Sequence, residues 1–189
     1  MTQFDKCIGI VDKSMRELGV KYAFISGTAL GLGRTGNCMD FDTDVDFCIP
    51  VSERPNLQNI KYVLFRNGLK QISEMKFGER IEGIGFSLIE NDTEWVELDF
   101  LHARDKQVWY SAFVGHDQPW ITKVYPKRMW NNLEHIYAYG IKCPVFHPIQ
   151  EYLEMLYGKD WKIPNQFYFN QELFRKTEAR HYDFDLVED

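Results

Sequence analysis

The chain lacks the features that mark zinc-binding, secreted or membrane-spanning proteins. Its four cysteines are scattered and form no Cys-x-x-Cys pair, so we expect no zinc site of that type. No apolar run reaches about 18 residues, and no signal peptide is recognisable. We therefore expect a cytoplasmic protein that has no transmembrane segment.

Basic charge is also scarce. The 22 Lys and Arg residues against 28 Asp and Glu residues give a formal net charge of -6, which predicts no large basic surface and no nucleic-acid partner. The 189 residues, 44% of them hydrophobic, contain no repeat, linker or low-complexity tract. We expect a single domain over residues 1–189, with its core over about 1–125 and further elements over 126–189.

Hydrophobic spacing along the chain predicts a mixture of helices and strands. Three- and four-residue steps indicate helices, and short apolar or alternating runs indicate strands. The expected helices cover residues 4–18, 28–33, 53–67 and 148–157. The expected strands cover residues 22–26, 69–77, 81–90, 95–101, 107–114, 120–125, 133–139 and 141–146, with turns near 115–117 and other glycines.

A cluster of carboxylates carries the chemistry of this chain. Asp40, Asp42, Asp44 and Asp46 follow the strand over 22–26 and the turn at Gly27 and Thr28. In an extended strand, alternate side chains share a face, so the last three aspartates project together while the apolar residues between them face a core. Carboxylates this close stay ionised together only around a cation, and hard oxygen ligands suit Mg²⁺ or Mn²⁺.

A solvated acidic loop is the simpler explanation of this cluster. Two features favour a functional site instead. The carboxylates lie within an apolar strand pattern, where unpaired charge is costly. They also follow a Gly-Thr turn whose N–H groups could hold a phosphate. Arg34 leaves the short helix nearby, either as a salt-bridge partner of Asp42 or as a ligand of substrate phosphate. The pattern therefore predicts a metal-dependent nucleotide-phosphate site.

Two ordered motifs resemble those of the LicD family, which includes bacterial phosphocholine transferases and fukutin-type ribitol-phosphate transferases. The first comprises Gly27-Thr-Ala-Leu-Gly31, Arg34, Gly36 and Asp42-Thr-Asp-Val-Asp46, with Asp40-Phe41 where Pro-Trp is common. The second, Tyr157-Gly158, Trp161 and Pro164, resembles the family's Tyr-Gly-x-x-Trp-x-x-Pro ending. The resemblance spans most of the chain.

The resemblance implies a fold and a set of site residues. The fold would be α/β (α+β), similar to the nucleotidyltransferase (polymerase-β-like) fold, with a twisted mixed sheet flanked by helices. Asp99, on the strand over 95–101, would be the third acidic residue, as metal ligand or general base. Glu97, on the same face, is the weaker candidate. The implied sets are Asp44, Asp46 and Asp99 for catalysis and metal binding, and Gly27, Thr28, Arg34 and Asp42 for substrate binding.

The resemblance also implies a reaction. A phospho-alcohol group such as phosphocholine or ribitol phosphate would be transferred from a CDP-activated alcohol, and CMP would be the leaving group. The acceptor would be a sugar hydroxyl of a glycan or glycolipid, and it could be lipid-linked. Two alternatives stay open: a nucleotidyltransferase that moves NMP from an NTP to a small molecule, and an inert binding module of the same fold. The intact Asp42-x-Asp44-x-Asp46 pattern argues against the inert module.

Overall fold

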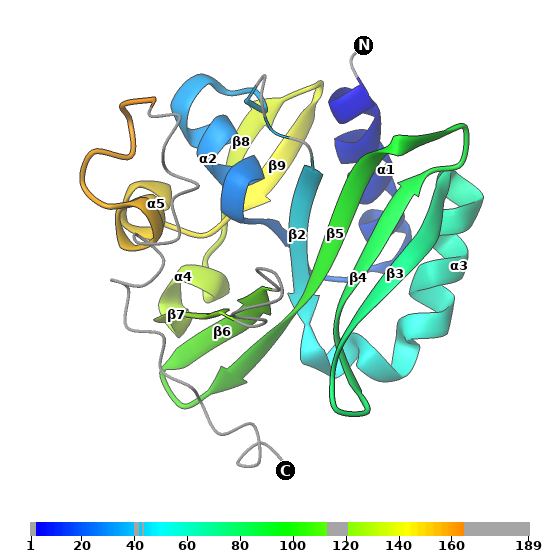
Figure 1. Ribbon diagram of the computed structural model, residues 1–189. Helices are drawn as coiled ribbons and strands as arrows, with labels where there is room; N and C mark the ends of the chain where they lie inside the picture. The colour runs from blue at the N-terminus through cyan, green and yellow to red at the C-terminus, as the bar shows by residue number, and fades with distance from the viewer. Residues whose placement is uncertain (1–2, 40–41, 43, 113–120, 165–189) are drawn as a thin grey trace.

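The computed structural model describes residues 3–39, 42, 44–112 and 121–164 (Figure 1). The helices are α1 (Gln3–Leu18), α2 (Ser26–Thr35), the 3-10 helix η1 (Val51–Asn56), α3 (Leu57–Asn67), α4 (Lys127–Asn131) and α5 (Ile149–Tyr157). The strands are β1 (Ala23–Phe24), β2 (Asp44–Pro50), β3 (Leu69–Phe77), β4 (Arg80–Leu88), β5 (Asn91–Arg104), β6 (Gln107–Ala112), β7 (Ile121–Pro126), β8 (Glu134–Ala138) and β9 (Ile141–Val145).

The strands form a mixed sheet whose central pair joins distant parts of the chain. The strand order is β3-β4-β5-β2-β1-β9-β8, and β6 pairs with both β5 and β7. The pairs β2–β5 and β1–β9 are parallel, whereas the other ladders are antiparallel. In Figure 1, β6 and β7 turn away from the end of β5 toward α4. The predicted mixed sheet flanked by helices is confirmed.

Amphipathic helices cover the sheet because each has one apolar face. Helix α1 buries Ile8, Val11 and Met15 and contacts β2, β5 and α3. Helix α3 buries Ile60 and Leu64 and packs on β3. The apolar side chains of β2 and β5 that alternate with the carboxylates are fully buried, so one face of each strand belongs to the core.

Glycines let the chain fold closely around α2. A Cβ on Gly31 would lie 2.5 Å from the carbonyl oxygen of Asn37, so only glycine lets the segment after α2 return across the helix. Gly36 ends the helix with a φ of 73°, a left-handed conformation that glycine adopts without strain. A Cβ on Gly27 would lie 2.8 Å from Asp42 Oδ2. The acidic segment therefore packs directly against the start of α2.

Some predicted boundaries were wrong. The helix expected over 53–67 begins at Leu57, and the preceding residues form the 3-10 helix η1, which contains Pro55. Proline is tolerated in the first turn of an α-helix, where its missing N–H would have no partner, so Pro55 gives no sequence signal against the earlier start. The strand expected over 22–26 is reduced to Ala23–Phe24, and α2 already begins at Ser26. Helix α4, at the basic spot of Lys127 and Arg128, was not predicted.

Several sequence features lie outside the described residues. These are Asp40, Phe41, the turn near 115–117 and the segment after residue 164. Among the described helices, none combines the length and apolar character needed to cross a bilayer.

Candidate active site

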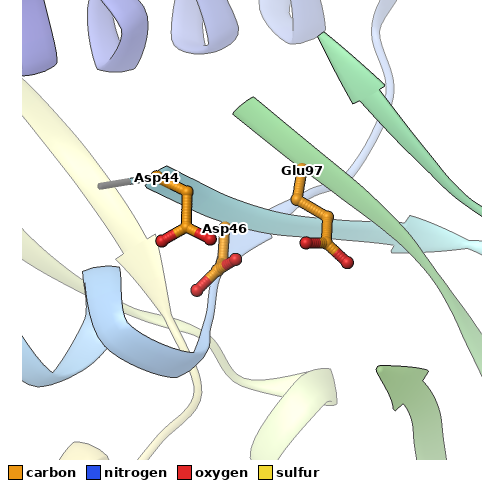
Figure 2. Close-up of side chains that lie close together, drawn as sticks. All are labelled: Asp44, Asp46 and Glu97. Carbon is orange, nitrogen blue, oxygen red and sulfur yellow. The ribbon is translucent and has the colours of Figure 1, made fainter. Parts of the chain in front are cut away.

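Parallel pairing of β2 with β5 assembles three carboxylates. The register places Asp46 opposite Glu97, and Asp44 lies on the same face of β2. One carboxylate oxygen from each of Asp44, Asp46 and Glu97 lies within 4.8 Å of the others. Figure 2 shows the three side chains on one side of the two strands. These oxygens are the ligand type that Mg²⁺ and Mn²⁺ prefer.

Burial and mutual repulsion disfavour charge on these carboxylates. Burial, with the nearby charges of Asp44 and Glu97, raises the pKa of Asp46 well above its usual value. Burial and the charge of Asp44 raise the pKa of Glu97 to about 7. Burial also raises the pKa of Asp44, against a hydrogen bond with Asp42. A divalent cation would relieve this repulsion, so the residues present fit such an ion.

Asp99 lies on the same face of β5 as Glu97, two residues further along the strand. Its register partners are Cys48 on β2 and Gly83 on β4, and its side chain is 4% exposed. Within the described part of the chain, Asp99 Oδ1 has no hydrogen-bond partner. Burial, with the charge of Glu97, raises the pKa of Asp99 well above its usual value. Glu97, rather than Asp99, completes the close group with Asp44 and Asp46, and the catalytic role of Asp99 stays a prediction.

The start of α2 holds Asp46 in place. The backbone N–H of Gly27 donates to Asp46 Oδ2 (3.2 Å from N to O), and the backbone N–H of Asp46 donates to Thr28 Oγ1 (2.9 Å). Thr28 is fully buried, and Asp42 is 7% exposed against Gly27. These residues connect the Gly-Thr turn to the acidic strand, and their contact with substrate stays a prediction.

Ser26 occupies a strained position beside the cluster. Its φ of 47° lies in the left-handed region, which is uncommon for residues other than glycine. Its backbone N–H donates to the Tyr152 hydroxyl (2.9 Å), and its Oγ lies 3.2 Å from the Tyr110 hydroxyl oxygen. The two tyrosine hydroxyl oxygens are 3.1 Å apart. A buried hydroxyl network therefore fixes the backbone at the start of α2.

Lys123 of β7 is the site residue that sequence reasoning missed. Its Nζ donates to Ser26 Oγ (3.2 Å) and lies 5.3 Å from the centre of the Tyr110 ring. Burial lowers the pKa of Lys123, whereas the charges of Asp46, Asp99 and other carboxylates of the cluster oppose that shift. One lysine in a short strand gives almost no signal in sequence, because the pairing of β6 with β7 decides where it points.

Arg34 connects the two sequence motifs. Its Nε donates to the carbonyl oxygen of Trp161 (2.5 Å) and its Nη2 to that of Ile163 (3.3 Å). Trp161 is buried and belongs to the hydrophobic core. Burial, with the charges of Asp46 and other residues, raises the pKa of Tyr157. Helix α5 also packs against α2, so the second motif lies beside the first, and a phosphate-binding role for Arg34 stays a prediction.

Comparisons with known proteins agree with this arrangement. The sequence model of a family described as LicD/FKTN/FKRP, nucleotidyltransferase domain, matches residues 19–147, which is more than half of the chain. The ribitol-5-phosphate transferases FKTN of Homo sapiens and Macaca fascicularis are each 25% identical over 154 residues, which is 80% of this chain and 32% of theirs. The chain thus spans about a third of the length of these relatives.

Two solved structures share the fold. One is the lincosamide antibiotic adenylyltransferase LnuA with lincomycin bound, with a TM-score of 0.53 and 12% identity over 91% of this chain and 96% of that one. The other is the antibiotic-resistance factor ANT(2'')-Ia, with a TM-score of 0.53 and 14% identity over 92% of this chain and 81% of that one. The predicted nucleotidyltransferase fold is confirmed.

Proposed function

The chain belongs to the LicD/FKTN/FKRP family of nucleotidyltransferase domains, and from this we propose that it transfers a phospho-alcohol group from a CDP-activated donor to a hydroxyl group of a carbohydrate acceptor. The observation that carries the proposal is the close group of Asp44, Asp46 and Glu97 beside the start of α2. The names of the FKTN relatives support ribitol phosphate as one candidate group, and phosphocholine is another.

Asp44, Asp46 and Glu97 would hold Mg²⁺ or Mn²⁺. When bound, such an ion would stabilise negative charge on the transferring phosphoryl group. The start of α2 at Gly27 would face the diphosphate of the donor, because the N-terminal end of a helix favours negative charge. Thr28 and Gly27 would keep Asp46 aimed at that position through their hydrogen bonds with it.

In the proposed step, the oxygen of the acceptor hydroxyl forms a bond to the phosphorus atom that carries the alcohol. The bond from this phosphorus to the bridging oxygen breaks, and CMP leaves with that oxygen and its electron pair. Asp99 would accept the proton of the attacking hydroxyl, because its buried Oδ1 has no hydrogen-bond partner among the described residues, and the charge of Lys123 favours the ionised form that this role needs. Arg34 of α2 and Asp42, just before β2, would contribute to binding of the substrate beside the acidic group.

A second candidate function is transfer of NMP from an NTP to a small molecule. The structural similarity to adenylyltransferases favours it, since the same fold and acidic strand can support attack at the α-phosphate. The two reactions release different products: CMP from a CDP-alcohol, or pyrophosphate from an NTP.

The test is a nucleotide-release assay with Mg²⁺ or Mn²⁺. The protein would receive CDP-ribitol, CDP-choline, CDP-glycerol or one of the four NTPs, with mixed glycan acceptors. We expect CMP release from one CDP-alcohol, and a loss of about a hundredfold or more for Asp46→Asn. The matched control is Asp105→Asn on the exposed turn between β5 and β6, which should retain activity. Pyrophosphate release, or an Asp46→Asn variant with full activity, would contradict the proposal.

A further inference from the structure

A nucleotide diphosphate at this site needs cationic or N–H partners in addition to a metal ion. Several groups in and around α2 that could provide them already have partners within the protein. Arg34 donates to two backbone carbonyls, and the N–H of Gly27 donates to Asp46. The N–H of Ser26 donates to Tyr152. The dipole of α2 still favours a phosphate at this end of the helix, but a full positive charge for it must come from another residue of the site.

Lys123 has the position that this role requires. Its Nζ lies 3.2 Å from Ser26 Oγ, directly beside the start of α2, and it interacts electrostatically with Asp46, Glu97 and Asp99. Its Nζ therefore lies beside the helix end and within electrostatic reach of the carboxylates, where it could also reach a bound phosphate. The ring of Tyr110, 5.3 Å from Nζ, supports the ammonium group by a cation–π interaction.

We propose that Lys123 is a catalytic residue that binds the phosphate oxygens of the nucleotide and stabilises their charge during transfer. This proposal rests on the proposed function of the same acidic site. An ammonium group suits the role because it is a compact point charge that contacts phosphate from many directions. Ser26, held by the two tyrosine hydroxyls, would set the position of this ammonium group.

The alternative is that Lys123 only neutralises the carboxylates. The two roles predict different responses to removal of the charge. Without Lys123, the carboxylates lose a competing cation, so both roles allow Mn²⁺ to bind as tightly as before or more tightly. Only the proposed role requires that binding of a nucleotide phosphate weakens at the same time.

The experiment measures Mn²⁺ binding and then CDP binding in saturating Mn²⁺, by calorimetry, for wild type and Lys123→Met. Methionine keeps much of the length of the side chain and removes its charge. Lys123→Arg, which keeps the charge, should retain part of the CDP affinity, and it serves as the second variant if Lys123→Met does not fold. The matched control is Lys142→Met, at an exposed position on β9.

We expect Lys123→Met to bind CDP roughly tenfold to a hundredfold more weakly while its Mn²⁺ affinity is unchanged or higher. Unchanged CDP affinity in Lys123→Met would overturn the proposal and leave Lys123 as a counter-ion of the carboxylates. A wild-type protein that binds no CDP would also overturn the proposal. A wild-type protein that binds CDP in a Lys123-dependent way but releases no CMP from any CDP-alcohol would support this role and contradict the proposed function instead.

Discussion

Replacement of Thr28 by valine tests how the start of α2 positions the acidic strand. Thr28 is fully buried, and its Oγ1 accepts the backbone N–H of Asp46 at 2.9 Å. Valine keeps the shape of threonine but removes the acceptor, so the N–H of Asp46 loses its partner in the protein interior. An unsatisfied buried donor costs about 1–3 kcal/mol.

The assay is thermal and urea denaturation of the metal-free protein, followed by Mn²⁺ titration. At about 2–4 °C per kcal/mol for a domain of this size, Thr28→Val should lower Tm by roughly 2–12 °C. It should also weaken Mn²⁺ binding, because Asp46 would no longer be fixed. Thr28→Ser keeps the hydroxyl and loses one buried methyl group, so it should cost about 1 kcal/mol and leave Mn²⁺ affinity unchanged.

A Thr28→Val variant with the stability and Mn²⁺ affinity of wild type would refute this reasoning. If that variant instead showed only a higher KM for the nucleotide donor, Thr28 would act by touching substrate, as the sequence motif predicts.

Three further predictions concern other parts of the chain. Gly31→Ala should destabilise the protein by about 1 kcal/mol or more in urea denaturation, because the new Cβ would lie 2.5 Å from a backbone oxygen. Gly9→Ala is the control: its Cβ would meet no atom within 4 Å, so it should stabilise α1 by about 0.5–1 kcal/mol. Equal effects of the two substitutions would contradict the packing of α2. The pKa of Glu97 is raised from 4.5 to about 7 in the folded protein, so between these values the folded metal-free protein binds more protons than the unfolded chain. The free energy of unfolding of the metal-free protein should therefore fall as pH rises from about 5 to 8. Saturating Mn²⁺, which binds the deprotonated carboxylates, should reverse this trend. Arg34→Met should speed amide hydrogen exchange after α5, because the side chain holds two carbonyls there; unchanged exchange would argue for a role toward substrate alone.

The acidic strand and most helices could be predicted from sequence because their signals are local. Alternation of carboxylates with apolar residues from Asp44 onward fixes which face of β2 carries the charge. The helical spacing of α1 and the glycine after α3 are similarly local signals. The helix that begins at Leu57 was placed too early, since apolar spacing alone does not distinguish a 3-10 turn from an α-helix.

Contacts set by strand register could not be predicted. Glu97 and Asp99 share a face of β5, and the family resemblance favoured Asp99 over Glu97 as the third acidic residue. The pairing of Asp46 with Glu97 decides that Glu97 reaches the close group. Lys123 depends in the same way on the pairing of β7 with β6. Such pairings are long-range properties of the whole sheet, so a single segment carries little information about them.

The most direct test of the account is the position of Mn²⁺ in crystals soaked with Mn²⁺ and CDP, measured by anomalous scattering. We expect a peak coordinated by Asp44, Asp46 and Glu97, with a CDP phosphate between that peak and the start of α2. A peak at another position, or CDP bound away from these three carboxylates, would contradict the claim that this acidic group is the centre of phosphate transfer.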